Sequence, residues 1–464
     1  MSAMRKIATV VGSSGIGKSK LAVELCKALS GQVINADALQ VYKGLDIITN
    51  KMPLNEREGI KHHLMDFLET EEEYQVTSFL KDASQKVATI HIESISEEKQ
   101  LPVVVGGTNY YIQSLLWNNT TIGKQENREA SPDEIDSNFP EFDQLETPEL
   151  YQRLSKVDPV MANKWHPSDR RKILRSLRVF YQTGKPQSEI IKSQRDHYET
   201  HGLDPRYKAL VFWIYSDPQK LNPRLDARVD QMIETGLFDE IKDLRNQVVQ
   251  GHVKLPKGFE LEKYQRGLWQ AIGYKEFDAY FFALEEGNKD PAELEKIKVE
   301  CTDRMKAATR RYAKSQIKWI KNKLLPTALN AKNNDVIVYC LDAGDLETWD
   351  TNVREKAVEI AKLFLMDLPL PDPASLSETA SQMLAQLNPV LDTQTKILTW
   401  NKHTCETCKT DKGEPLVLNG DQEWEQHKKG RHHRKYLKHL RVEEKRKAYL
   451  ESKKKEQEEQ TTIE

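Results

Sequence analysis

Short apolar runs alternate with amphipathic stretches over residues 6–116. Three of these runs, KIATVVG, QVINAD and LPVVVGGT, are rich in β-branched residues, and helical patterns separate them at KSKLAVELCKAL and near residues 75–98. Continuous apolar runs joined by helices are typical of parallel strands that are buried on both faces. We therefore predict an α/β fold, a parallel sheet flanked by helices, with residues 1–117 as the first part of its core.

The strand pattern stops at about residue 118 and returns after residue 204. Between these points TPELYQRLSKVDPVMANKWHP and SDRRKILRSLRVFYQTGKP each have the periodicity of one amphipathic helix. We expect Ser168 to cap the second helix and Gly184 to end it. The pattern predicts a helical insertion domain at residues 118–204.

The core resumes with ALVFWIYS, a predicted strand, followed by long helices at NPRLDARVDQMIETGLFDEIKDL and ELEKIKVECTDRMKAATRRYAKSQIKWIKNKLL. A last strand at DVIVYCLDA and a last helix complete the second part of the core at residues 205–366. Proline and serine in MDLPLPDPASLSETASQ indicate a linker at residues 367–398. A small Cys/His unit at residues 399–440 and a charged tail at residues 441–464 follow.

Charge is balanced over the whole chain but not along it. The 464 residues are 38% apolar, enough for several domains, and 69 basic against 71 acidic side chains give a formal net charge of −2. Residues 428–447 nevertheless hold ten Lys or Arg and two Glu, a local net charge of +8. That block is a candidate contact for a polyanion, and it also has the composition of a nuclear import signal.

Cysteine usage and apolar run lengths bear on the compartment. The five cysteines are odd in number and scattered, which favours a reducing compartment over a disulfide framework. No apolar run approaches the roughly 18 residues of a membrane span, and the first strand begins too early for a signal peptide. We expect a monomeric cytoplasmic protein with no membrane partner. Met1 and Met4 are alternative starts, so mitochondrial and nuclear pools stay open.

A glycine loop joins the first predicted strand to the first helix. Its spacing is GxxxxGK[ST], in which loop amides and the positive end of the following helix converge on phosphate. Lys18 adds a charge and Ser19 offers a hydroxyl to Mg²⁺. The alternative interpretation is an ordinary strand, turn and helix. The candidate anion-binding residues are Gly12, Ser13, Ser14, Gly15, Ile16, Gly17, Lys18 and Ser19.

Acidic residues are arranged differently from those of a nucleotide-hydrolysing protein. The run LPVVVGG ends in Gly106 and Gly107, where such a protein has an aspartate that holds Mg²⁺. This weakens the prediction of an ATPase and leaves a small-molecule or nucleotide kinase open. Asp37 instead follows the second strand, at the edge where parallel sheets bind their ligands. Taken alone, an aspartate there is more often a helix cap or a turn residue.

Eight motifs occur in one order along the chain, and together they are more specific than the glycine loop. They are GSSGIGKSKLA, INADALQVYKGLDIITNK, HHLMDF, PVVVGGTNYY, RRKILRSLRVFYQTGKP, RLDARVDQMIETG, QAIGYKEF and TRRYAKSQIKWIK. In this order they resemble the tRNA dimethylallyltransferases, also called tRNA isopentenyltransferases, over most of residues 5–325.

This resemblance implies that the loop binds dimethylallyl diphosphate. The prenyl group would move to N6 of the adenosine at tRNA position 37, next to the anticodon, and diphosphate would leave. Asp37 would accept a proton from N6, because an adenine amino group is a weak nucleophile. Ser14, Lys18 and Ser19 would donate to the diphosphate, with Mg²⁺ as the cofactor.

Further diphosphate contacts are implied at Thr108, Arg224 and Arg228. The two arginines lie one turn apart on a helix face, so both can aim at one anion, and the family pattern favours Arg228. Without the resemblance they are equally typical of a solvated face. The implied catalytic residues are Asp37, Ser14 and Arg228.

The resemblance also implies contacts with the anticodon stem-loop of tRNA, whose target adenosine must leave the loop stack to react. Basic residues recur from Arg304 to Lys321, a pattern that by itself is more typical of a solvated helix face. The implied tRNA-binding residues are Asp37, Ala38, Leu39, Gln40, Arg171, Arg175, Trp269, Gly273, Tyr274, Lys275, Lys314, Gln316 and Lys318.

Two cysteines and two histidines near the end of the sequence have metal-ligand spacing. Cys405 and Cys408 form a CxxC pair, and His427 and His433 follow, which suits a tetrahedral structural Zn²⁺. His432 is an alternative to His433, and an unmetallated CxxC loop is the alternative to a metal site. The unit resembles the C2H2 zinc finger of eukaryotic members of the family. The finger and basic tail alone would also fit a non-catalytic RNA-binding protein.

Overall fold

The chain forms two compact units, one of residues 1–124 and 196–390 and the other of residues 125–195 and 391–464. The structure, a computed structural model, describes residues 4–93, 100–118, 142, 144–201, 204–255, 264, 267–287, 290–329, 335–385, 401–409, 413, 415–438 and 440. The predicted helical insertion and the predicted Cys/His unit thus fall largely in the second unit. The predicted tail at residues 441–464 lies outside the described residues.

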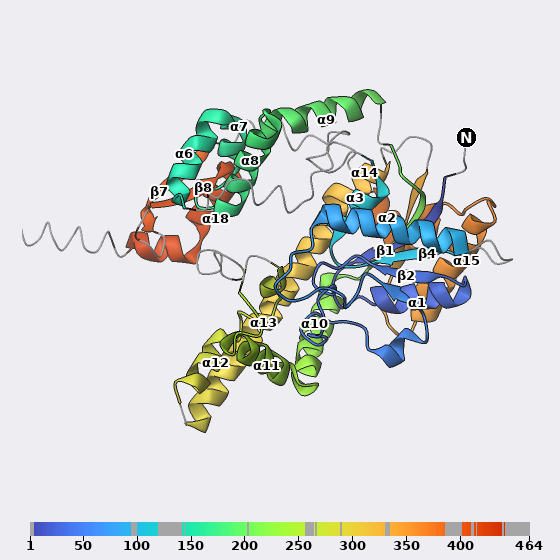
Figure 1. The fold of residues 1–464 in the computed structure, drawn as a ribbon, viewed down its shortest axis with the longest axis horizontal. Coiled ribbons are helices and arrows are strands. Elements are labelled where there is room, and N and C mark those ends of the chain that lie inside the picture. Colours follow the sequence, from blue (N-terminus) through green and yellow to red (C-terminus); the bar gives the residue numbers. More distant parts are fainter. Residues whose placement is uncertain are drawn as a thin grey trace, which may run out of the picture. The chain divides into compact units, whose positions relative to one another are not determined.

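A six-stranded sheet in which every pairing is parallel forms the centre of the first unit (Figure 1), which confirms the predicted α/β class. The strand order is β3-β2-β4-β1-β5-β6. The short β3 was not predicted, because two residues carry no pattern. The strands are β1 (Lys6–Gly12), β2 (Gln32–Asn35), β3 (His62–His63), β4 (Pro102–Val105), β5 (Lys208–Tyr215) and β6 (Val336–Asp342).

Helices cover both faces of this sheet (Figure 1). In β1, Ile7 and Val11 face one apolar core while Ala8 and Val10 face the other, because successive side chains of a strand point to opposite faces. The first core contains α2 (Val76–Glu93), α3 (Asn109–Leu116), α14 (Leu325–Leu329) and α16 (Glu378–Ala385). The second core contains α1 (Lys18–Ala28), α15 (Glu355–Leu365) and the first half of α10 (Pro218–Glu234).

The segment predicted as a linker is packed in its first half. Ala380 of α16 is fully buried in the first core, with Leu376 and Met383 against it, and Thr379 Oγ1 donates to Asp342 Oδ2 at the end of β6. The prediction of a linker is therefore wrong up to residue 385, because apolar side chains between the prolines bury themselves on the sheet. Residues 386–400 of the predicted linker lie outside the described residues.

A third apolar core is built from the long helices that follow β5. It holds the end of α10, α11 (Leu237–Val249), α12 (Asp278–Glu285) and the first half of α13 (Pro291–Trp319). The prediction of a single helix through residue 244 is wrong, since Gly236 adopts φ 111° between α10 and α11. The prediction of a long helix from residue 293 is confirmed, although α13 passes through a wider π-helical turn at Ile320–Leu324.

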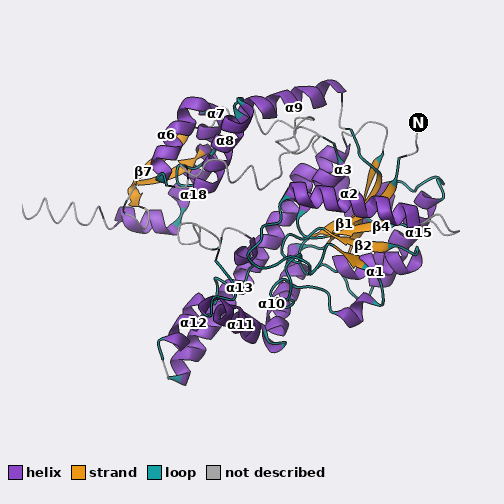
Figure 2. Cartoon of the chain, viewed as in Figure 1, coloured by secondary structure: helices purple, strands orange, loops and turns teal. Residues whose placement is uncertain are grey.

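The second unit contains helices that pack around Phe142, Leu150, Leu174 and Leu177 (Figure 2). The helices are α6 (Thr147–Val157), α7 (Pro159–Lys164), α8 (Arg170–Thr183) and the first part of α9 (Gln187–His201), which passes into the first unit at Asp196. One helix was expected where α6 and α7 stand. It is interrupted because Pro159 has no amide to donate and Asp158 caps the new helix by accepting from Met161 N at 3.1 Å. The N-cap of α8 is Asp169 rather than Ser168, while Gly184 ends that helix as predicted.

An antiparallel hairpin and two helical segments hold the Cys/His residues of the second unit. The hairpin is β7 (Lys402–Lys409) and β8 (Pro415–Asn419), and α18 (Gly420–Lys429) follows it. His433 lies in a further helical segment, residues 431–438. Lys402 Nζ donates to Ala162 O at 2.8 Å and Trp165 O at 2.9 Å, at the end of α7. His166 bonds to Val417 O at 2.9 Å. The hairpin is therefore attached to the helical insertion through polar contacts on both of its strands.

Within the part of the chain that the structure describes, the longest helices are too polar to cross a bilayer.

Candidate functional site

The carboxyl ends of β1, β2 and β4 meet at one edge of the sheet. Asn35 of β2 is in register with Val105 of β4, and beyond this pair Ala36 N donates to Val105 O at 2.7 Å and Thr108 N to Ala36 O at 3.2 Å. Register alone therefore places Asp37 beside Gly107. The glycine loop at residues 12–19, called the phosphate loop from here on, leaves β1 at the same edge. Open parallel sheets bind ligands at this edge.

The phosphate loop is shaped by close packing around its last glycine. Gly17 has φ 96°, and a Cβ there would lie 2.6 Å from the ring of Trp349. Trp349 is itself fixed, because its indole N–H donates to both carboxylate oxygens of Glu24, at 3.1 and 3.0 Å. Only glycine fits a left-handed backbone this close to a buried ring. Packing against Trp349 therefore shapes the loop.

Two partly buried cations, Lys18 and Arg228, belong to this edge of the sheet, and Lys18 Nζ donates to Ser13 O at 2.8 Å. Burial lowers the pKa of Lys18 to about 8, with Asp37 raising it and Arg228 lowering it further. Burial also lowers the pKa of Arg228, whose Nε is buried and has no hydrogen-bond partner among the described residues. Two desolvated like charges destabilise each other, and a bound polyanion would relieve both.

Asn50 and its loop position Arg228. Asn50 Oδ1 accepts from Arg228 Nη2, and Gln40 Nε2 donates to Asn50 O at 3.0 Å. The buried Lys51 secures the same loop by donating to Tyr42 O and to Asp66 Oδ1, each at 2.6 Å. Asn50 was not predicted from the sequence, since no spacing signal links it to Arg228, which lies far away in the chain.

Arg224 lies in a different environment from Arg228. Its Nη1 and Nη2 donate to Ala343 O at 2.8 Å and Gly344 O at 2.7 Å, just after β6. The two arginines were predicted to bind one anion together, and this placement corrects that prediction. The guanidinium of Arg224 binds carbonyls after β6, whereas Arg228 acts at the phosphate loop. Of the two arginines, Arg228 is the one that shifts the pKa of Lys18.

Asp37 is oriented by two backbone amides. Its Oδ1 accepts from Leu39 N at 3.0 Å, a turn contact, and its Oδ2 accepts from Gly107 N at 3.3 Å. The next residue is fixed by Thr108, whose Oγ1 accepts from Ala38 N at 3.0 Å. Asp37 therefore makes the expected turn while one oxygen stays directed at the β4 edge.

Two phenols lie near this carboxylate. Burial raises the pKa of Tyr111 on α3 and of Tyr312 on α13, and the negative charge of Asp37 raises both further. Both phenols therefore stay protonated. The hydroxyl of Tyr111 already donates to Tyr74 O at 2.7 Å, so the exposed Tyr312 is the phenol that suits a surface for a polar heterocycle. Neither tyrosine was assigned to the site from the sequence, and helical spacing alone gave no such signal.

The predicted tRNA-binding residues divide into buried and exposed groups. Trp269 and Tyr274, only 1% and 7% exposed, belong to the third core, and Gly273 N donates to Glu276 Oε2 at 2.9 Å. Trp269 was predicted to bind tRNA, but its ring fills the third core instead. The amide of Gln40 is likewise engaged by its own loop. The exposed members are Lys275, Lys314, Lys318, Arg171 and Arg175, the last two on α8 of the second unit.

The Cys/His residues of the second unit come together as predicted. One ligand atom from each of Cys405, Cys408, His427 and His433 lies within 4.8 Å of all the others. His433 Nδ1 is 3.5 Å from Cys405 Sγ and 3.3 Å from Cys408 Sγ, while His427 Nε2 is buried without a partner among the described residues. His432 is exposed, so His433 is the fourth member of the cluster. Two thiols, two imidazoles and an orphaned nitrogen fit a tetrahedral Zn²⁺.

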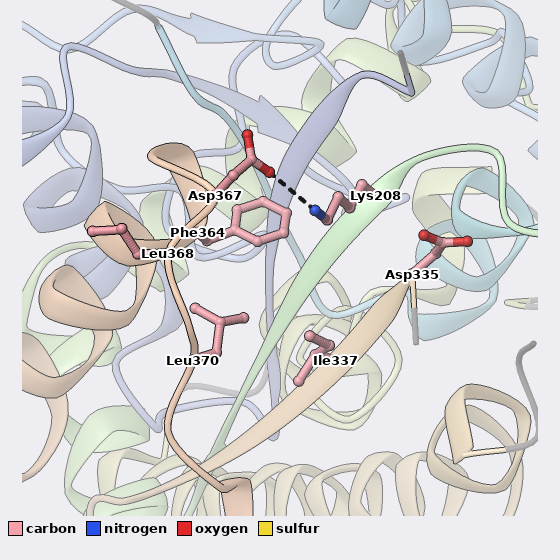
Figure 3. Close-up of a pocket in the computed structure, with 7 residues that line it drawn as sticks. All are labelled: Lys208, Asp335, Ile337, Phe364, Asp367, Leu368 and Leu370. Carbon is pink, nitrogen blue, oxygen red and sulfur yellow. Dashed lines mark hydrogen bonds and ion pairs between the residues drawn. The ribbon is translucent and has the colours of Figure 1, made fainter. Parts of the chain in front are cut away.

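A pocket of about 290 Å³ lies on the opposite edge of the sheet, at the amino-terminal ends of β5 and β6 (Figure 3). Asp367 accepts there from Lys208 at 3.1 Å and from Lys6, and these hydrogen bonds, Lys6 foremost, lower the pKa of Asp367 to about 2. Lys208 and Asp367 are thus paired with each other, and the third charged residue of the lining, Asp335, is acidic. The pocket therefore lacks the surplus positive charge of the phosphate-loop edge.

Comparison with known proteins agrees with this geometry. The sequence model of the IPP transferase family matches residues 40–323. The chain is 37% identical over 447 residues to a tRNA dimethylallyltransferase of Schizosaccharomyces pombe, covering 93% of this chain and 94% of that protein. It is 33% identical to one of Homo sapiens, covering 94% and 86%. A solved structure of a eukaryotic dimethylallyltransferase acting on tRNA superposes with a TM-score of 0.70 at 33% identity, covering 96% of this chain and all of that one.

Proposed function

Since the chain belongs to the IPP transferase family of tRNA-modifying prenyltransferases, we propose that its phosphate loop and Asp37 divide the reaction between donor and acceptor. The dimethylallyl group moves from dimethylallyl diphosphate to N6 of the adenosine next to the anticodon. The observation that carries the proposal is that Asp37 is hydrogen-bonded to Gly107 at the edge from which the phosphate loop leaves the sheet, where its charge and that of Arg228 both act on the pKa of Lys18.

The donor binds at the loop. As the bond from the allylic carbon to oxygen breaks, the electron pair stays on the diphosphate. Lys18, Arg228 and the loop amides stabilise the negative charge that develops there, and they do so most where charge is greatest. The cations are fixed in advance, so little reorganisation accompanies the step.

The acceptor approaches from the β2 and β4 side of the edge. The N6 lone pair forms the new bond to carbon. One N6 proton then passes to a lone pair on a carboxylate oxygen of Asp37. A positioned base contributes about 10² to 10⁴ in rate. Thr108 and Gly107 keep Asp37 in place, and the exposed phenol of Tyr312, whose pKa the charge of Asp37 raises, would border the adenine.

Two metals belong to the proposal in different ways. Zn²⁺ held by Cys405, Cys408, His427 and His433 would fix the hairpin and α18, and the basic residues after His433 then contribute phosphate contacts with tRNA. Mg²⁺ would neutralise charge on the diphosphate. Ser19, in the first turn of α1 directly after Lys18, offers a hydroxyl for it.

A kinase that moves phosphate to a small molecule is the competing function. It would need the same loop but no base for a purine amine. The favoured function is tested by incubating the chain with tRNA, labelled dimethylallyl diphosphate and, separately, labelled ATP, followed by mass analysis of the tRNA nucleosides. We expect prenylated adenosine and released diphosphate. Consumption of ATP without prenylated adenosine would overturn the proposal.

The base is tested by Asp37→Ala. We expect tRNA binding to be retained and transfer to fall by at least about 10², in line with the loss of a general base. Asp82→Ala is the control, because Asp82 lies on α2 and accepts from Tyr74 Oη at 2.8 Å, outside the site. Unchanged turnover of the Asp37 variant would remove Asp37 from the reaction.

A further inference from the structure

Gln316 joins two parts of the candidate site that are far apart in sequence. It lies on α13, only 3% exposed, and its Oε1 accepts from Ser14 N at 2.8 Å and from Ser14 Oγ at 3.2 Å. Its Nε2 donates to Gly107 O at 3.1 Å. Both ends of the carboxamide are engaged inside the protein. The prediction of Gln316 as a tRNA contact therefore does not fit its surroundings.

Gly107 is the residue at which these contacts reach the base. Its N–H donates to Asp37 Oδ2 at 3.3 Å while its carbonyl accepts from Gln316. A Cβ on Gly107 would lie 2.8 Å from Asp37 Oδ2 and 2.9 Å from Gln316 Nε2. Glycine thus allows both side chains to approach the same residue. A continuous series of hydrogen bonds results, from Ser14 through Gln316 and Gly107 to Asp37.

We propose that Gln316 is a positioning residue for prenyl transfer, which holds the phosphate loop at a fixed distance from the glycine that orients Asp37. The inference rests on the proposed function, since it needs Asp37 as the base. Only a carboxamide serves both ends, because Ser14 requires an acceptor and Gly107 requires a donor. A displacement of reacting groups by about 1 Å lowers the rate by roughly 10². A buried side chain that links the donor site to the base therefore has a large effect.

Gln316→Met tests this link, because methionine has a similar length but cannot form the hydrogen bonds to Ser14 and Gly107. We expect kcat at saturating tRNA and donor to fall at least about tenfold, with KM for tRNA within about twofold of wild type. Ser315→Ala is the matched control: Ser315 is the exposed neighbour on the same helix and bonds only to Tyr312 O within the described chain, so wild-type values are expected.

Gln316→Glu gives a second readout that a merely structural residue would not change. The carboxylate still accepts from Ser14, but it faces Gly107 O and adds a negative charge near Asp37. We expect the acid limb of the kcat profile to move to higher pH, because a second carboxylate disfavours the ionised base. The charge of Asp37 shifts the pKa values of Lys18 of α1, Tyr111 of α3 and Tyr312 of α13, and these three residues are unchanged in this variant.

The kinetic results distinguish a positioning residue from an RNA contact. A raised KM for tRNA with wild-type kcat would make Gln316 an RNA contact and overturn the inference, and so would wild-type kcat and an unmoved acid limb in both variants. If thermal melting shows that Gln316→Met does not fold, the pH profile of the nearly isosteric Gln316→Glu decides. Failure of the proposed function looks different, since wild-type protein would then yield no prenylated adenosine.

Discussion

The phosphate loop and the Cys/His cluster are both compact binding sites, but their geometry is maintained by different means. The loop is held by the protein itself, with Gly17 packed against Trp349 and Ser14 hydrogen-bonded to Gln316. The cluster has two thiols within 3.5 Å of one imidazole and a buried His427 Nε2 that has no partner within the described residues. The loop is shaped by the fold itself, whereas the cluster has the donor set that a metal ion would complete.

This difference predicts where each site is vulnerable. Removing a ligand from the loop leaves its shape intact, so damage there must come through the packing that shapes it. Removing the ion from the cluster leaves buried donors uncompensated, and metal-binding free energy is folding free energy in such small units. Substitutions of packing residues and of ligand residues therefore test the two sites independently.

Gly17→Ala should have the largest effect. A left-handed alanine costs about 1 kcal/mol, and its Cβ would overlap the Trp349 ring at 2.6 Å, so the loop must shift. We expect kcat/KM for dimethylallyl diphosphate to fall at least about 10² while zinc content is unchanged. Steady-state kinetics with varied donor give the value.

Gly251→Ala is the matched control for this change, because Gly251 has φ 74° and nothing within 4 Å of an added Cβ. It bears the left-handed backbone cost alone, so a small loss of stability and wild-type kinetics are expected. If Gly17→Ala were no worse than Gly251→Ala, packing on Trp349 would not shape the loop.

His433→Ala should have the next largest effect, and at the other site. The variant removes the imidazole that lies nearest both thiols, so bound zinc is lost and the hairpin loosens. We expect KM for tRNA to rise at least about fivefold and its salt dependence to flatten, with kcat at saturating tRNA nearly unchanged. Metal analysis of the purified protein and tRNA titrations at two salt concentrations measure both effects.

The exposed neighbour His432 supplies the control. His432→Ala removes the same side chain one position away, and it should retain zinc and wild-type KM for tRNA. Loss of zinc in this variant instead of in His433→Ala would reverse the assignment of the fourth ligand.

Sequence patterns predicted what local spacing encodes. The loop from Gly12 to Ser19, the strands that position it, and Cys405, Cys408 and His427 all follow from short-range motifs. Asp37 could be placed at the site because consecutive parallel strands end at one edge of a sheet.

What the sequence left open depends on tertiary contacts. Arg224 and Arg228 have identical helical spacing, yet the carbonyls of Ala343 and Gly344 hold one and Asn50 holds the other. The choice between His432 and His433 likewise needed the direction of a helix that follows α18. Such choices are made by partners that are distant in the chain, so no local pattern reveals them.

The smallest expected effect concerns the charge of the loop itself. Lys18 has its pKa lowered to about 8 by burial, so it is protonated and binds an anion below that pH and loses its charge as the pH rises through it. The ratio of wild-type to Lys18→Met affinity for inorganic diphosphate should fall about fourfold between pH 7 and pH 8.5. Calorimetric titration of both proteins across this range measures the ratio, and the variant cancels the ionisation of the ligand. A ratio that stays constant to pH 9 would mean that Lys18 remains charged, and that the desolvated pair with Arg228 is not what prepares this loop for its anion.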